Sequence, residues 1–239
     1  ILLGNAAAHH EKAASLLSLA NWIAQQTGAS VGYLSEAANT VGAQLVNAVP
    51  GQGGLNAGQM LGGALKALVL LNTEPGHDSA AGTQGLASAG MVVTLSPFKT
   101  NLDISDVLLP VAPFTETSGS FVNAEGRLQS FHAVVRPLGE TRPAWKVIRV
   151  LGNLLGLAGF DADSSQAVLA SALPGVASGA VVDAARLNNA SAASIDLSPA
   201  VAEPCVASIY QLDGLVRRAP ALQLTADARA TLIADEVHA

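Results

Sequence analysis

The sequence predicts an α/β fold with a doubly wound, mostly parallel sheet and a small C-terminal extension. Short apolar strand patterns alternate with helical patterns up to about Phe160, which is the order typical of βαβ units. The run at 66–71 is almost continuously apolar, as expected of a strand that is buried on both faces. Beyond Phe160, Ala, Ser and Asp dominate and strand patterns are weak. We therefore predict an α/β domain at 1–160 and an extension of helix and loop at 161–239.

The individual elements follow from periodicity and from end signals. Strands are predicted where short apolar runs occur, at 1–3, 30–34, 66–71, 91–95 and 106–111. Helices are predicted at 11–26, 57–65, 79–89, from Pro143 onward, and at 164–173 and 225–237. Gly28 is expected to end the first helix, Pro143 suits a first helical turn, and Thr225 is expected to cap the last helix.

The composition excludes several classes of protein. The net charge is −6 and the 12 Lys and Arg residues form no basic stripe, which argues against a nucleic-acid partner and an electrostatic membrane anchor. No apolar stretch reaches the roughly 18–20 residues of a membrane helix, so no direct membrane insertion is expected. Only 13% of the residues are charged, which favours contact with other subunits. The lone cysteine, Cys205, excludes an internal disulfide or a cysteine-held cluster and is expected to be a buried, inert thiol.

The segment 106–129 is the strongest candidate for a site, because an apolar strand runs there into a predicted polar loop. Ligands of open α/β sheets bind where strands end. The candidate residues, as a working or vestigial site, are Glu116, Ser118, Asn123, Glu125 and Arg127. Two interpretations remain open. Arg127 pairs with the two glutamates in a structural network, or its guanidinium group points outward and holds an anion. No catalytic residue is predicted.

Two further motifs have a structural interpretation that outweighs the functional one. The glycine-rich stretch 51–63 could approach a phosphate, but it lacks the nucleotide-binding patterns and is predicted to be a tight loop. His9, His10 and Glu11 could hold a metal, but no third ligand is evident and a polar helix start is predicted. No metal site is therefore expected.

The segment 72–78 follows the most apolar strand. Glu74, His77 and Asp78 could perform acid–base chemistry if a nucleophile lay opposite them. The favoured prediction is a solvated turn in which Asp78 or Ser79 caps the next helix.

Several segments also carry a resemblance to known proteins. ETSGSFVNAEGRLQ, at 116–129, resembles the end of the catalytic core of molybdopterin-dependent oxidoreductases. Together with its flanks it is similar to one branch, the large iron–sulfur subunit of bacterial NADH:quinone oxidoreductase, respiratory complex I. Three other segments agree with that branch: AVPGQGGLNAGQML, KALVLLNTEPGHD and IYQLDGLVRRAPALQLT.

The resemblance implies a function as well as a fold. The chain would belong to the peripheral arm of complex I, on the cytoplasmic side of the bacterial inner membrane, where electrons pass from NADH to quinone. Its partners would be other peripheral-arm subunits, and it would be a scaffold that keeps the molybdopterin fold without a cofactor. The iron–sulfur clusters would lie in an N-terminal region that precedes this chain, which agrees with its start at Ile1 without a methionine.

The alternative is an enzyme. The chain would then be the cofactor-gripping half of a molybdopterin-dependent oxidoreductase, such as a formate dehydrogenase-like protein. In such enzymes the resemblance implies that the loop at 72–78 faces the nucleotide-like end of the cofactor. The residue that ligates the metal would lie upstream of this chain.

Overall fold

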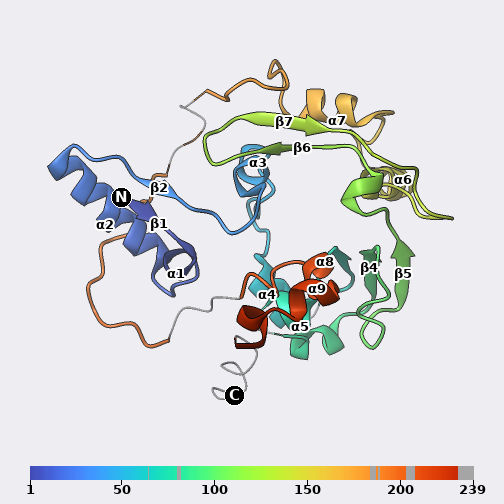
Figure 1. Ribbon diagram of the computed structural model, residues 1–239, viewed down its shortest axis with the longest axis horizontal. Coiled ribbons are helices and arrows are strands. Elements are labelled where there is room, and N and C mark those ends of the chain that lie inside the picture. The colour runs from blue at the N-terminus through green and yellow to red at the C-terminus, as the bar shows by residue number, and fades with distance from the viewer. Residues whose placement is uncertain (64, 80–81, 184–186, 188, 203–207, 231–239) are drawn as a thin grey trace. The chain divides into compact units, whose positions relative to one another are not determined.

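The structure, a computed structural model, describes residues 1–63, 65–79, 82–183, 187, 189–202 and 208–230 (Figure 1). The chain forms two compact units, each built from two separate stretches. Unit 1 contains 1–56 and 110–204, and unit 2 contains 57–109 and 205–239. The predicted α/β class is confirmed, with helices beside small, mostly parallel sheets. The predicted domain boundary near residue 160 stays a prediction.

Unit 2 is built on a three-stranded sheet in the order β3-β4-β5. These strands are β3 (Leu68–Leu71), β4 (Val92–Ser96) and β5 (Val107–Pro110), and β3 and β4 run parallel from the pair Leu68–Val92 to the pair Leu71–Leu95. Five buried side chains form its core: Leu61, Leu68, Leu70, Leu86 and Val92. The helices of this unit are α4 (Ala57–Gly62), α5 (Pro75–Asp78), the 3-10 helix η1 (Gln84–Ser88), α8 (Gly214–Arg217) and α9 (Pro220–Gln223).

The burial of β3 differs from the sequence prediction. Leu68 and Leu70 are buried, whereas Val69 and Leu71 are 53% and 38% exposed. The described chain therefore covers one face of this strand, and the prediction that both faces are buried is wrong for it. An apolar run shows that a strand is hydrophobic, but it cannot show which layer is present to cover each face.

Unit 1 begins with a small parallel sheet and a long helix. The strands β1 (Leu2–Leu3) and β2 (Gly32–Tyr33) pair in parallel, and α1 (Asn5–Ala8) and α2 (Ala13–Thr27) lie between them in the chain. As predicted, α2 ends at Gly28, which has a φ of +72°. A distant segment is tied to this helix, since Ser18 donates to the Ala193 carbonyl and Asn21 to the Asn189 carbonyl, both at 2.8 Å.

The other part of unit 1 contains an antiparallel hairpin of β6 (Gly119–Val122) and β7 (Leu128–Phe131). Its helices are α3 (Thr40–Leu45), the 3-10 helix η2 (Phe114–Glu116), α6 (Ala144–Leu154) and α7 (Ser165–Ala172). The core consists of Val122, Leu128, Leu173 and Val182. The predicted polar loop at 116–129 is therefore wrong in its centre. This part of the segment, in spite of its serine and glycine residues, is a strand whose last residue, Val122, lies in the core.

The helix ends agree in part with the predictions. The Thr225 hydroxyl accepts a hydrogen bond from the Ala228 amide, as predicted, whereas Pro143, predicted within a first turn, is the residue that precedes α6. Ser164, for which no cap was predicted, caps α7 by accepting a hydrogen bond from the Ala167 amide. The helix predicted at 79–89 shortens to η1, and α5 precedes it. Residues 226–230 are helical, while 231–237 and Cys205 lie outside the described residues. Across the described part of the chain, the helices are too short or too polar to cross a membrane.

Candidate functional site

The predicted site residues lie at both ends of the β6–β7 hairpin. Glu116 and Ser118 precede β6, and Asn123, Glu125 and Arg127 form the connection to β7. The structure therefore separates the five residues into two groups. One group borders a cavity, and the other builds the turn.

The turn satisfies its own polar groups. The Asn123 Oδ1 accepts from the Glu125 amide at 3.1 Å and from the Arg127 amide at 2.9 Å. Gly126 has a φ of +80°, which a side chain would disfavour. The Arg127 guanidinium donates to the Gly179 carbonyl at 3.1 Å, and in the described chain no ion pair joins it to either glutamate. Arg127 thus holds the hairpin to the segment beside it, by a contact that neither sequence interpretation anticipated.

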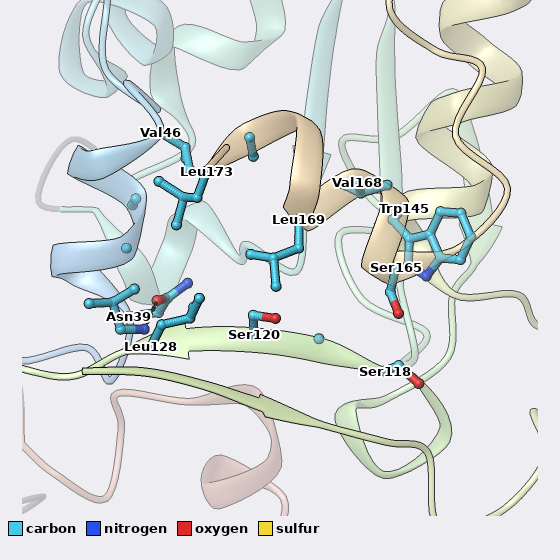
Figure 2. A pocket seen from close by; sticks show the side chains of 15 residues that line it. Asn39, Val46, Ser118, Ser120, Leu128, Trp145, Ser165, Val168, Leu169 and Leu173 are labelled. Carbon is cyan, nitrogen blue, oxygen red and sulfur yellow. Dashed lines mark hydrogen bonds between the residues drawn. The ribbon is translucent and has the colours of Figure 1, made fainter. Parts of the chain in front are cut away.

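An apolar cavity of about 250 Å³ lies between the hairpin and the helices α3 and α7 (Figure 2). Its aliphatic lining includes Val122, Leu128, Val168, Leu169 and Leu173. Its polar groups are largely engaged, since the Asn39 Oδ1 accepts from the Val122 amide at 2.9 Å and the Ser120 hydroxyl bonds to that of Ser130. We call this space the apolar cavity.

A second cavity of about 470 Å³ has a different chemistry. Three of the 12 basic residues of the chain line it, Arg136, Arg142 and Lys146, together with hydroxyl groups and Glu116. Glu116 is engaged, because its carboxylate accepts from the Leu138 amide at 2.9 Å. We call this space the cationic cavity. Sequence reasoning missed it, although three cations within 136–146 were a local signal in an acidic chain.

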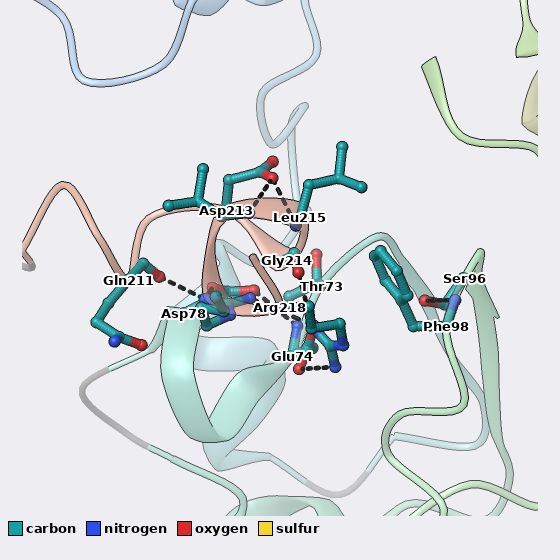
Figure 3. Close-up of polar contacts among 12 residues, drawn as sticks. Thr73, Glu74, Asp78, Ser96, Phe98, Gln211, Asp213, Gly214, Leu215 and Arg218 are labelled. Carbon is teal, nitrogen blue, oxygen red and sulfur yellow. Dashed lines mark hydrogen bonds and ion pairs between the residues drawn. The ribbon is translucent and has the colours of Figure 1, made fainter. Parts of the chain in front are cut away.

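In unit 2, the strand ends are covered by side chains of the same unit (Figure 3). Glu74, just after β3, is buried and receives both fork nitrogens of Arg218, at 2.8 and 2.9 Å. The Arg218 guanidinium also lies 4.4 Å from the ring centroid of Phe98, which follows β4. Arg217 donates to Asp78 at 2.8 Å. The predicted solvated turn is therefore wrong, because the glutamate is inside an ion-pair cluster.

The electrostatics of Glu74 reflect two opposing effects. Burial alone would raise the pKa of this carboxyl, but hydrogen bonds from Arg218 and Thr100 and the nearby charge of Arg217 lower it to about 2. Asp78 also accepts from the Glu74 amide at 2.7 Å, so the helix α5 is capped from within. The Glu74 carboxylate is thus engaged by its arginine partners and is not available as a general base at neutral pH.

The remaining sequence candidates also have structural roles. His9 lies 2.7 Å from the Glu36 carboxylate, and the Glu11 carboxylate accepts from the Val201 amide at 2.8 Å. Within the described ranges, no group of His, Cys, Asp and Glu could hold a metal ion. The stretch 51–56 is irregular, and a hydrogen bond from the Gly54 amide to the Gly51 carbonyl closes a tight turn there.

A comparison with family models assigns the chain. The model described as "Molybdopterin oxidoreductase" matches residues 3–154, more than half of the chain. The chain therefore belongs to the molybdopterin oxidoreductase family.

Curated relatives match over short stretches. The probable oxidoreductase YjgC of Bacillus subtilis (strain 168) is 43% identical over 54 residues, which is 23% of this chain and 6% of that protein. A putative formate dehydrogenase of Staphylococcus aureus (strain bovine RF122 / ET3-1) is 42% identical over 52 residues, or 22% and 5% of the two chains. One from S. aureus (strain USA300) is 40% identical over 52 residues, also 22% and 5%. The matches thus span a small part of these relatives.

The described residues do not fit a whole molybdopterin cofactor. Such a cofactor needs hydrogen-bond donors to its phosphate, hydrogen-bonding partners for the polar pterin ring and a ligand for its metal. The cationic cavity offers hydrogen-bond donors to a phosphate, but the lining of the neighbouring apolar cavity is largely aliphatic. In unit 2, beyond the strand ends where α/β sheets bind ligands, Glu74 after β3 is paired with Arg218, which also lies against Phe98 after β4.

Proposed function

We propose that the chain is a region of a formate dehydrogenase-like, molybdopterin-dependent oxidoreductase, in which it supports a cofactor that other segments of the protein bind. The observation that carries this proposal is the family match over 3–154, which includes the three-stranded sheet and the hairpin. The relatives named formate dehydrogenase favour this enzyme class. In such an enzyme the bound molybdenum would supply the redox chemistry. This chain would supply the fold around it.

The residues of the chain suit a supporting role. Arg127 and Asn123 hold the hairpin turn. The ion pair of Glu74 and Arg218, 144 residues apart in the sequence, joins the two stretches of unit 2. These contacts engage polar side chains of both units in holding the fold itself.

The test is to purify the longest natural polypeptide that contains this chain and to measure molybdenum, pterin fluorescence and formate-dependent dye reduction. The proposal expects molybdenum and pterin in stoichiometric amounts and formate oxidation. It also expects Arg127→Ala to lower thermal stability while the metal content is retained. A polypeptide without either molybdenum or pterin would refute the proposal.

A second candidate is a scaffold region of the large iron–sulfur subunit of complex I, and one observation favours it. KALVLLNTEPGHD and IYQLDGLVRRAPALQLT, two segments that resemble this subunit, contribute Glu74 and Arg218, the two partners of the buried ion pair. An arginine that fills the strand ends suits a domain that has dispensed with its cofactor. Its partners would then be peripheral-arm subunits at the cytoplasmic face of the bacterial inner membrane.

Native gels of detergent-solubilised membranes test this candidate. An antibody to the chain should detect a long, cysteine-rich polypeptide that comigrates with NADH-oxidising activity and iron–sulfur proteins. Migration as a separate molybdenum-containing species would exclude it.

A further inference from the structure

We propose that the apolar and cationic cavities of unit 1 form one binding site for a small amphipathic anion, with an alkyl or aryl body and one phosphate or carboxylate head. The inference does not depend on the proposed function. It rests on the different linings of the two cavities and on the residues that they share.

The two cavities adjoin one another. Ser118, Trp145 and Ser165 line both of them, and Figure 2 shows these three side chains together at one end of the apolar cavity. The indole of Trp145 therefore lies where the chemistry changes from aliphatic to cationic. The Lys146 ammonium lies 5.3 Å from the centroid of that ring, on the cationic side. A ligand that passes Trp145 would meet a positive charge at once.

The cationic cavity favours a single anionic head. Lys146 and Arg136 are exposed and line the cavity, whereas Arg142 donates to the Thr141 carbonyl at 2.8 Å and lies 3.6 Å from the Glu140 carboxylate. The Ser118 hydroxyl accepts from the Ala133 amide at 3.4 Å, which leaves its own proton for a ligand oxygen. Guanidinium and ammonium groups bind phosphate and carboxylate oxygens with charge-assisted hydrogen bonds.

The apolar cavity favours an uncharged body. Its described lining contains no charged side chain, and burying an apolar group there is favourable because Leu128, Leu169 and Leu173 are partly or fully withdrawn from water. A polar ring such as a pterin would find few partners here, and an alkyl chain would need none. The cationic cavity thus favours the anionic head of the ligand, and the apolar cavity favours its uncharged body.

Isothermal titration calorimetry of the purified protein tests the site with butyl, hexyl and octyl phosphate, nonanoate, octanol and inorganic phosphate. The affinity of the alkyl phosphates should rise roughly threefold to fourfold for each methylene. Octanol and inorganic phosphate should each bind at least about tenfold more weakly than octyl phosphate, because each lacks one end. Tighter binding of either octyl phosphate or nonanoate supports the site and identifies the preferred head.

Two double variants of equal charge change make the test specific. Arg136→Gln with Lys146→Gln should weaken octyl phosphate binding about tenfold, whereas Lys66→Gln with Lys99→Gln, at exposed positions of unit 2, should leave it unchanged. All four positions are exposed, so both variants should fold, which circular dichroism checks. Equal weakening in both variants, an affinity independent of alkyl length, or no saturable binding would each overturn the proposal.

Discussion

Glu74 is a buried carboxylate of unit 2 that two arginines contact. Its carboxylate accepts two parallel bonds from Arg218, whose position in the sequence is 144 residues away. The carboxyl follows the most apolar strand of the sequence, which is why sequence reasoning selected it as a functional candidate. Its partner could not be predicted, because nothing local distinguishes Arg218 from Arg217 or from the other arginines.

Replacement of Glu74 should therefore be costly. Glu74→Gln removes the carboxylate that faces the buried Arg217 and the more exposed Arg218, and because solvent screens the second pair we expect a loss of about 2 kcal/mol in the free energy of unfolding. Urea denaturation followed by circular dichroism measures it. Glu125→Gln, on the exposed hairpin turn, is the matched control and should change stability by less than about 0.5 kcal/mol. Equal stability of the two variants would show that the ion pair contributes nothing.

The contribution of the Glu74 ion pairs to stability should also depend on pH. The folded pKa of Glu74 is about 2, below the ordinary value of 4.5, so its stabilising contribution is complete above pH 4.5 and disappears as the pH falls toward 2. The difference in free energy of unfolding between the wild-type protein and Glu74→Gln should thus shrink as the pH falls from 4.5 toward 2. Unfolding free energies at a series of pH values between these limits measure it. An advantage that stays constant down to the folded pKa would contradict the assignment.

At the scale of elements, the helix α6 shows how a glycine can be required inside a helix. Gly152 is buried, and the Phe160 ring lies directly against its Cα, so that a Cβ would overlap the ring. The Asn153 amide group also donates to the Phe160 carbonyl at 3.1 Å, which holds the aromatic residue in place. The sequence suggested only a mid-helix glycine, which is normally a weakness.

The variant Gly152→Ala separates the two effects. Helix propensity should gain about 1 kcal/mol, but displacement of the Phe160 ring should cost about 1–3 kcal/mol, so a net loss of stability is expected. Thermal unfolding of this variant and of Gly62→Ala measures the difference, since Gly62 in α4 has open space around it. In a Phe160→Ala background the glycine substitution should become stabilising. A gain in stability from Gly152→Ala alone would refute the packing argument.

The hairpin illustrates what an element-level prediction can miss. Val122 and Leu128 are both buried, and the turn between them contains Gly126 at positive φ, which is a recognisable hairpin pattern. The small residues Gly119 and Ser120 weakened that pattern, because strand propensity reflects packing against neighbours that the sequence does not identify. Phe131 supplies that packing, with its ring over Gly119 and edge-on to Phe121 at 5.3 Å.

At the scale of the whole molecule, many aliphatic side chains are exposed in the described part of the chain. The outer side of β3 presents Val69 and Leu71, and many other aliphatic residues are exposed. Exposed apolar patches of this kind mark contact with other protein. The expectation from the sequence that such surfaces contact other subunits stays a prediction.

The isolated chain should accordingly self-associate through such surfaces. A double variant, Val69→Thr with Leu71→Thr, should lower light scattering and the binding of a hydrophobic dye, while the free energy of unfolding changes by less than about 1 kcal/mol. Leu70→Thr is the control on the buried side of the same strand and should destabilise by about 2–4 kcal/mol. Unchanged scattering in the double variant would show that this face takes no part in association.

The sequence by itself determined the α/β class, the positions of most strands, the helix ends at Gly28 and Thr225, and the resemblance to molybdopterin oxidoreductases, because these depend on local periodicity and on ordered motifs. Only the tertiary structure decided what the polar residues do. It placed Arg127 on a backbone carbonyl and joined Glu74 to Arg218. The physical reason is that hydrogen bonds and ion pairs depend on distances of a few ångströms, and the fold brings together groups whose separation along the chain carries no such information.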